Sequence, residues 1–183
     1  MIQSIYLIRH ATPDWSRTDL VYHLPPGPPL TKQGLQEART LGAFLLSGGV
    51  RQFYASPLER CFHTAQIAAQ VAAAPWQIES GLSEWGPGDT TESVLLRAWP
   101  VFERVSQEGL AKGPVALVTH GGPVSALLQK LGVDSEILAQ HKALFDHNNP
   151  LPPAGAWLAE RPSLGAAWSL RLAFKPEPVQ SAL

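Results

Sequence analysis

Two short apolar runs, each followed by a histidine, constrain the fold of this 183-residue chain more than any other feature. The first run is Ile5–Ile8, followed by Arg9 and His10, and the second is Val115–Thr119, followed by His120. Short runs rich in β-branched and aromatic residues predict buried strands of a parallel sheet. Because open α/β folds bind ligands at the carboxyl edge of such strands, we expect both histidines at one site.

Helical patterns separate the strand candidates. Thr31 is expected to cap a helix that ends near Gly48, and an apolar stripe over Leu58–Ala72 predicts a second helix. Two more helices are expected from about Thr91 to Val105 and from Pro123 to Leu131. The other strand candidates are Gln52–Ala55, Trp76–Glu79, Ala156–Ala159 and Trp168–Phe174.

This alternation predicts an α/β fold, a three-layer sandwich with a mostly parallel central sheet and helices on both faces. We expect a single domain over residues 1–183, with a frayed tail from about Pro176.

Composition narrows the class of protein. Apolar residues make up 45% and charged residues 16%, which is typical of a globular domain, and the net charge of −1 lacks the basic footprint of a nucleic-acid binder. The single cysteine, Cys61, rules out an internal disulfide. There is no signal-peptide pattern and no run of about 18 apolar residues. We therefore expect a cytoplasmic protein that binds neither nucleic acid nor membrane.

The segment Ser56–Arg60 predicts the start of the second helix. Ser56 suits the N-cap, Pro57 suits the first helical position, and Glu59 completes a capping box. Arg60 then lies in the first turns, near the carboxyl edge of the sheet, where a guanidinium can hold phosphate oxygens through paired donors. With the two strand-end histidines, this arrangement predicts a phosphate site with an imidazole nucleophile.

Five blocks of sequence stand in order along the chain: Leu7–Thr12, Pro29–Thr31 with Gly34 and Ala38, Ser56–Arg60 with Thr64 and Ala65, Leu82–Glu84, and Val118–Gly122. In type and order they are similar to the histidine phosphatase superfamily, which includes the cofactor-dependent phosphoglycerate mutases. The resemblance implies a phosphoglycerate mutase-like fold. It gives little guidance beyond about Leu131.

The resemblance also implies a role for each matching residue. His10 would attack phosphorus and become a phosphohistidine that water later hydrolyses. Arg9, Arg60 and His120 would surround the transferring phosphoryl group, and the two arginines would help to keep His10 neutral. Glu84 would protonate the leaving alkoxide and then activate water. The catalytic residues are thus expected to be His10, Glu84 and His120, with no metal and no cofactor.

Departures from the family pattern concern the neighbourhood of His10. Ala11 stands where the family usually has glycine, and its methyl group is expected to crowd the pocket. Ser16 replaces an asparagine after Trp15, and we include its hydroxyl among the phosphate ligands because it can donate one hydrogen bond. The short segment from Glu84 to Glu92 suggests an open pocket.

The remaining candidates are given structural roles. Glu92 is assigned to the pocket rim or to a helix start, with Asp89 as its capping partner. Cys61 lies on the apolar stripe and is expected to be buried, and His63 is expected at the pocket rim. The surface and loop histidines are expected to be His23, His141 and His147.

The sequence thus predicts a metal-independent phosphatase that acts on a phosphorylated small molecule through a phosphohistidine. Three alternatives stay open: a cofactor-dependent phosphoglycerate mutase, a protein phosphohistidine phosphatase, and a non-catalytic module that binds phospholigands. The physiological substrate and the oligomeric state are not determined by the sequence.

Overall fold

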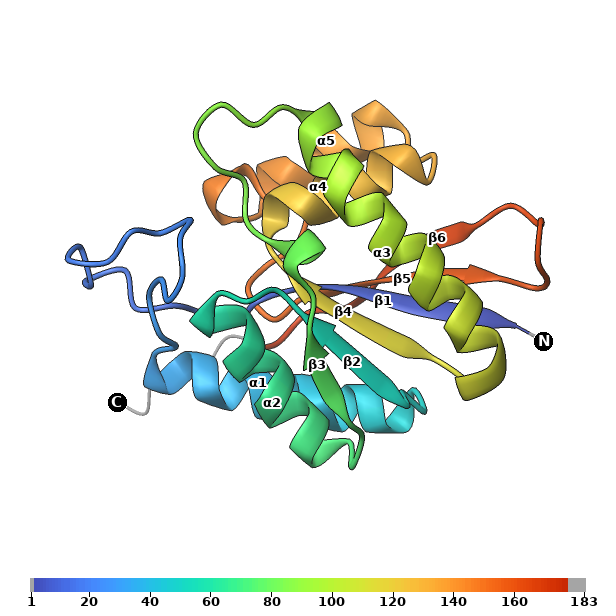
Figure 1. The fold of residues 1–183 in the computed structure, drawn as a ribbon, viewed down its shortest axis with the longest axis horizontal. Helices are drawn as coiled ribbons and strands as arrows, with labels where there is room; N and C mark the ends of the chain where they lie inside the picture. Colours follow the sequence, from blue (N-terminus) through green and yellow to red (C-terminus); the bar gives the residue numbers. More distant parts are fainter. Residues whose placement is uncertain (1, 178–183) are drawn as a thin grey trace.

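The computed structural model describes residues 2–177 and confirms the predicted α/β class. Its six strands form one sheet in the order β3-β2-β4-β1-β5-β6 (Figure 1). The strands are β1 (Gln3–Arg9), β2 (Gln52–Ala55), β3 (Trp76–Ile78), β4 (Val115–Thr119), β5 (Ala156–Arg161) and β6 (Ser169–Phe174). The helices are α1 (Lys32–Ser47), α2 (Glu59–Val71), α3 (Thr91–Lys112), α4 (Gly121–Lys130) and α5 (Ser135–Leu144), with short 3₁₀ turns η1 (Ser80–Leu82) and η2 (Asp146–Asn148).

Strand pairing brings the two histidines together. Strands β3, β2, β4 and β1 run parallel, whereas β5 and β6 join the sheet antiparallel. Arg9 at the end of β1 is in register with Thr119 at the end of β4, and the His10 amide donates to the Thr119 carbonyl at 2.9 Å. Both strands therefore end at the same level, as predicted.

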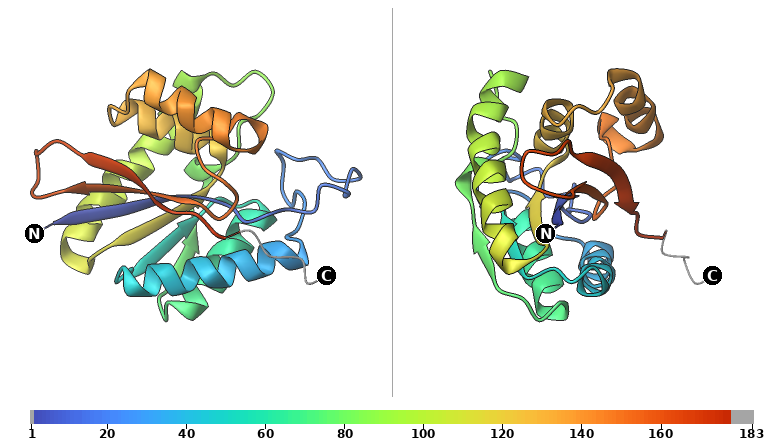
Figure 2. Two further views of the ribbon diagram at one scale, coloured as in Figure 1. Left: turned by 180° about the vertical axis from the view of Figure 1, so that it is seen from behind. Right: turned by 90° about the vertical axis from the view of Figure 1, so that its right-hand side faces the viewer.

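The sheet is buried on both faces, which makes the molecule a three-layer sandwich. Side chains of β1 alternate between two cores: Tyr6 and Ile8 pack toward α1 and α2, and Ile5 and Leu7 pack toward α3 and α4. Figure 2 shows these helices on opposite sides of the sheet. Nearly continuous apolar strands such as β4, with all five residues buried, are typical of a sheet covered on both faces.

Most element boundaries match the predictions, with two differences. Helix α3 continues past Val105 to Lys112 although Pro100 lies inside it. Helix α5 was not predicted, because only Leu138 of its residues is buried and it carries no apolar stripe. His141 lies half-buried on this helix, with its ring centroid 4.7 Å from that of Trp157, so it does not lie in a loop.

The helix caps correct the sequence analysis. Thr31 does cap α1, because its hydroxyl accepts from the Gly34 amide at 2.9 Å. Helix α2, however, begins at Glu59 with Leu58 as its N-cap and no side-chain cap, so the predicted capping box of Ser56 is wrong. The buried Ser56 hydroxyl accepts from the Leu58 amide at 3.4 Å and lies 2.9 Å from Nε2 of His120.

Helix α3 begins at Thr91 as predicted, but its capping residues differ from the prediction. Thr90 and Ser93 form its capping box, not Asp89 and Glu92. Asp89 instead accepts hydrogen bonds from Arg97, at 2.7 and 3.0 Å.

Within residues 2–177, no helix is both long and apolar enough to span a bilayer. The expected frayed tail lies, from residue 178 onward, outside the described residues.

Candidate active site

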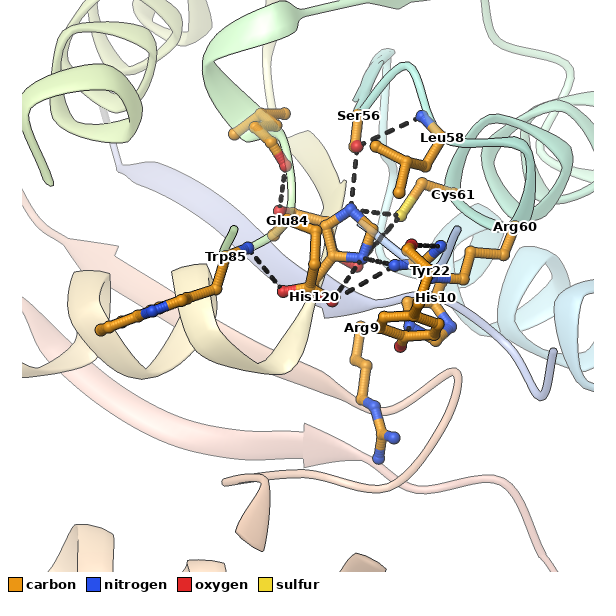
Figure 3. Close-up of polar contacts among 12 residues, drawn as sticks. Arg9, His10, Tyr22, Ser56, Leu58, Arg60, Cys61, Glu84, Trp85 and His120 are labelled. Atoms are coloured by element: carbon orange, nitrogen blue, oxygen red, sulfur yellow. Dashed lines mark hydrogen bonds and ion pairs between the residues drawn. The ribbon is translucent and has the colours of Figure 1, made fainter. Parts of the chain in front are cut away.

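Four predicted side chains converge at the carboxyl edge of the parallel strands (Figure 3). His10 follows β1, His120 follows β4, Arg60 lies in the first turn of α2, and Glu84 follows η1. The rings of His10 and His120 are 5.3 Å apart between centroids. Elements far apart in sequence thus form one polar cluster.

His10 is buried and held in one tautomer when neutral. Its Nδ1 lies 2.8 Å from the Ala11 carbonyl oxygen, which can only accept, so Nδ1 carries the proton. This leaves a lone pair on Nε2, to which the Tyr22 hydroxyl donates across 3.3 Å. Burial lowers the pKa of His10 well below its usual range, and the charges of Arg60, His120 and Arg9 lower it further. The ring is therefore neutral at pH 7.

Arg60 is fully buried and organises the cluster. Its Nη1 donates to the Tyr22 carbonyl at 2.8 Å, and its guanidinium lies 3.8 Å from the centroid of the Tyr22 ring. Its Nη2 lies 3.1 Å from Nδ1 of His120 and 3.3 Å from Oε2 of Glu84. Its Nε is buried without a hydrogen-bond partner among the described residues.

His120 and Glu84 form a close pair. Oε2 of Glu84 lies 3.1 Å from Nδ1 of His120, and Oε1 accepts from the Trp85 amide at 2.8 Å. Burial raises the pKa of Glu84, but its contacts with His120, the Trp85 amide and Arg60 outweigh burial and lower the pKa below its usual range. Burial lowers the pKa of His120, although Glu84 opposes this.

Arg9 is buried beside His10, but another carboxylate occupies its donors. Nη1 and Nη2 donate to the two carboxylate oxygens of Asp146 at 2.6 and 2.8 Å, and Nη1 also donates to the Leu151 carbonyl. Burial raises the pKa of Asp146, but its bond to Arg9 lowers it more. The guanidinium of Arg9 thus anchors the turn η2, and its phosphate role stays a prediction.

Ser16 is not brought to the site. It is exposed, its hydroxyl donates to Asp14 at 2.6 Å, and it is not among the residues that line the cavity. Ala11 does not crowd the pocket, because its methyl group is fully buried in the core and its amide donates to the Thr64 hydroxyl at 3.0 Å.

A cavity of about 350 Å³ opens over the cluster. Its walls are Arg9, His10, Trp15, Tyr22, Glu84, Trp85, Gly121, Gly122, His147 and Asn149. Gly121 and Gly122 begin α4, whose N-cap His120 makes no side-chain cap bond, so amides of the first turn remain for a ligand. Gly121 is required here, since a Cβ would fall 1.4 Å from Oδ1 of Asn149.

Several site residues were missed by the sequence analysis. Tyr22 lies in a loop without periodicity, Asp146 comes from the region where the family resemblance gave no guidance, and Ser56 was taken for a cap. His147 lies in a turn, as expected, yet it also lines the cavity.

Among the residues that were predicted to have structural roles, some lie where expected and others do not. Cys61 is buried as predicted, with its Sγ 3.3 Å from Nε2 of His120, and burial raises the pKa of its thiol. His63 pairs with Glu59 and does not line the cavity, so its placement at the rim was wrong. Glu92 is exposed in the first turn of α3.

The same cluster also has a spacing that could hold a divalent cation. His10, Glu84 and His120 each offer a ligand atom, and these atoms lie within 4.8 Å of one another. The guanidinium of Arg60, 3.1 Å from Nδ1 of His120, opposes a cation there and favours an anion. The metal-free reaction stays a prediction.

Comparison with known proteins identifies relatives. The model of the histidine phosphatase superfamily (branch 1) matches residues 5–92. The transcription factor tau 55 kDa subunit of Saccharomyces cerevisiae is 26% identical over 184 residues, which cover 74% of this chain and 42% of that protein. The chain thus spans less than half the length of the yeast subunit.

A 2,3-bisphosphoglycerate-dependent phosphoglycerate mutase of Thermoplasma acidophilum is 26% identical over 145 residues, or 67% of this chain and 72% of the mutase. Among solved structures, a mycobacterial glucosyl-3-phosphoglycerate phosphatase aligns over 96% of this chain and 100% of its own, with a TM-score of 0.74 and 16% identity. That structural likeness concerns the fold alone. Over residues 5–92 this chain is thus similar to the histidine phosphatase superfamily, and its fold is phosphoglycerate mutase-like.

Proposed function

We propose that the protein hydrolyses phosphomonoesters through a phosphohistidine formed on Nε2 of His10. The observation that carries this proposal is the buried neutral imidazole, whose unprotonated Nε2 lies within a cluster that favours anions. A neutral imidazole with a fixed lone pair is a competent nucleophile, whereas an imidazolium is not.

In the first step, the Nε2 lone pair attacks phosphorus and the bond to the ester oxygen breaks. The phosphoryl group moves to His10, and the leaving alkoxide takes a proton. Nδ1 keeps its proton, which is hydrogen-bonded to the Ala11 carbonyl. The phosphorylated ring therefore carries a positive charge and is a good leaving group for the second step. Water then attacks phosphorus, which returns the lone pair to Nε2 and releases inorganic phosphate.

Glu84 supplies and recovers the proton. In the unliganded site it is ionised and paired with Arg60 at 3.3 Å. A bound phosphate competes for Arg60 and adds negative charge beside the carboxylate, which raises its pKa and lets it take up a proton. It can then protonate the alkoxide and, as a carboxylate, accept a proton from the attacking water.

Positive groups stabilise the transferring phosphoryl group. Arg60, with its unpartnered Nε, and the first-turn amides of α4 can donate to phosphoryl oxygens. We assign the same role to His120, whose Nε2 is oriented by Ser56. Arg9 can also donate to phosphoryl oxygens if the phosphate displaces Asp146 from its guanidinium. Otherwise Arg9 stabilises the phosphoryl group through its positive charge alone.

His10→Ala tests the proposal with p-nitrophenyl phosphate as the substrate. Removal of the nucleophile should lower kcat by about 10³-fold or more. His63→Ala, on the exposed side of α2, is the matched control and should keep parental activity. Alkaline quenching of the parent during turnover should trap a base-stable, acid-labile phosphoryl group that is missing from His10→Ala. Parental activity in His10→Ala would refute the proposal.

A mutase is the second candidate, favoured by the match to the Thermoplasma enzyme. It would return the phosphoryl group to another hydroxyl instead of to water. Incubation with 3-phosphoglycerate and its bisphosphate, followed by phosphorus NMR, distinguishes the two. Isomerisation faster than phosphate release would favour the mutase, and phosphate binding without either reaction would favour a binding module.

A further inference from the structure

A second cavity, of about 250 Å³, adjoins the catalytic one. The two share five residues, namely Trp85, Gly121, Gly122, His147 and Asn149. The second cavity is completed by Thr91, Ser125, Ala126, Gln129, Lys142 and Asn148. Because the walls are shared, a ligand whose phosphate sits at His10 can extend past Trp85 into the second cavity.

The shared wall has a flat face beside the phosphoryl site. A Cβ on Gly122 would fall 3.3 Å from Cε3 of Trp85, so the indole packs directly on the glycine backbone. Glu84, the proposed proton donor, precedes Trp85 and lies 3.7 Å from the same Cβ position. The ester oxygen that Glu84 protonates must therefore lie near this wall, and the alcohol attached to it continues along the wall.

The walls of the second cavity suit a ligand that is polar and negatively charged. Ser125 and Gln129 of α4 and Asn148 of η2 offer hydroxyl and amide groups, which pair with ligand hydroxyls. Lys142 in the last turn of α5 supplies the positive charge. Among the described residues that line this cavity, none carries a carboxylate, and Asp146 in the adjoining turn pairs with Arg9.

We propose that the second cavity binds the alcohol portion of the substrate, and that this alcohol is polyhydroxylated and carries a carboxylate bound by Lys142. One ammonium group matches one carboxylate in charge, while the hydroxyl and amide groups of the walls satisfy the polyol. This inference rests on the proposed phosphatase function, because it places the phosphate at His10. It adds Lys142, on a helix that lacked any sequence signal, as the residue that determines specificity.

Two six-carbon esters that differ in one group test the inference. In 6-phosphogluconate the carbon farthest from the phosphate is a carboxylate, and in glucitol 6-phosphate it is a hydroxymethyl group. For the parent protein, kcat/KM for phosphate release should be at least about tenfold higher with 6-phosphogluconate than with glucitol 6-phosphate. This ratio corresponds to the contribution of one charge-assisted hydrogen bond. Lys142→Met should bring the ratio of the two values close to one, and Lys142→Arg should restore most of it.

Lys130→Met is the matched control. Lys130 lies on the neighbouring helix α4, with its ammonium 5.5 Å from the centroid of the Trp99 ring, and does not line the second cavity. It should keep the parental ratio. If the parent shows no preference between the two esters, or if Lys142→Met keeps the preference, the inference is wrong.

A binding experiment separates this outcome from failure of the proposed function. Calorimetry on His10→Ala and on His10→Ala/Lys142→Met gives the dissociation constants of both esters without turnover. Preferential binding of 6-phosphogluconate that requires Lys142 supports the second site even if no hydrolysis is found. Equal binding of the two esters overturns it even if p-nitrophenyl phosphate is hydrolysed through His10.

Discussion

At the scale of single residues, the two arginines of the site have unequal surroundings. Both are buried, yet Arg60 contacts His120 and Glu84 inside the cluster, whereas Arg9 is bound by both oxygens of Asp146. A buried guanidinium needs a partner, because removal from water costs several kcal/mol. Arg60 therefore lies inside the polar cluster, whereas Arg9 secures a neighbouring turn.

The proposed role of Glu84 as proton donor leads to a prediction about leaving groups. If Glu84 protonates the alkoxide, Glu84→Gln should reduce kcat by about 10²-fold to 10⁴-fold for an alkyl phosphate, whose leaving group needs the proton. Hydrolysis of p-nitrophenyl phosphate should change far less, since nitrophenolate leaves without one. Steady-state kinetics with both esters checks this prediction. The control is Glu92→Gln, since Glu92 is an exposed residue in the first turn of α3. An equal loss with both esters would show that Glu84 is not the acid.

At the scale of elements, the start of α2 shows how tertiary contacts override a local signal. The segment Ser56–Glu59 has the residue types of a capping box. In the fold, the Ser56 hydroxyl lies 2.9 Å from Nε2 of His120, and the helix starts three residues later. The hydroxyl satisfies a buried imidazole, which would otherwise lose its partner in the interior.

Ser56→Ala and Thr31→Ala should therefore differ. Both should lower the free energy of unfolding, by about 1–3 kcal/mol for the unpaired imidazole and about 1 kcal/mol for the lost cap. Only Ser56→Ala should also lower kcat, because it removes the hydroxyl at Nε2 of His120 and leaves the weaker contact with Cys61 Sγ there. Urea unfolding and p-nitrophenyl phosphate turnover measure the two effects. Parental kcat in Ser56→Ala would argue against a role for this contact.

At the scale of the whole molecule, burial of two neutral histidines couples the site to stability. Burial holds the pKa of His10 and of His120 below the values they have in the unfolded chain. As the pH falls through about 6.5, the unfolded chain therefore binds protons that the folded chain does not. The free energy of unfolding should decrease as the solution becomes acidic, down to the folded-state pKa values.

Urea unfolding at pH 7.5, 6.5 and 5.5 tests this coupling. Each buried histidine should contribute a slope of up to about 1.4 kcal/mol per pH unit below pH 6.5. His10→Ala removes one of the two groups and should flatten the slope. Identical slopes in the parent and in His10→Ala would mean that His10 is not held neutral.

The sequence by itself determined the sheet and the convergence of its polar ends. The apolar runs that precede His10 and His120 form adjacent parallel strands, and parallel pairing brings the carboxyl ends of such strands to one edge. Only the tertiary structure decided what each side chain touches there: Asp146 on Arg9, Ser56 on His120, and Ser16 turned to Asp14. The physical reason is the distance along the chain over which each kind of interaction acts. Strand and helix patterns follow from neighbours in the chain, whereas the partners of a buried charge come from wherever packing brings a donor or an acceptor.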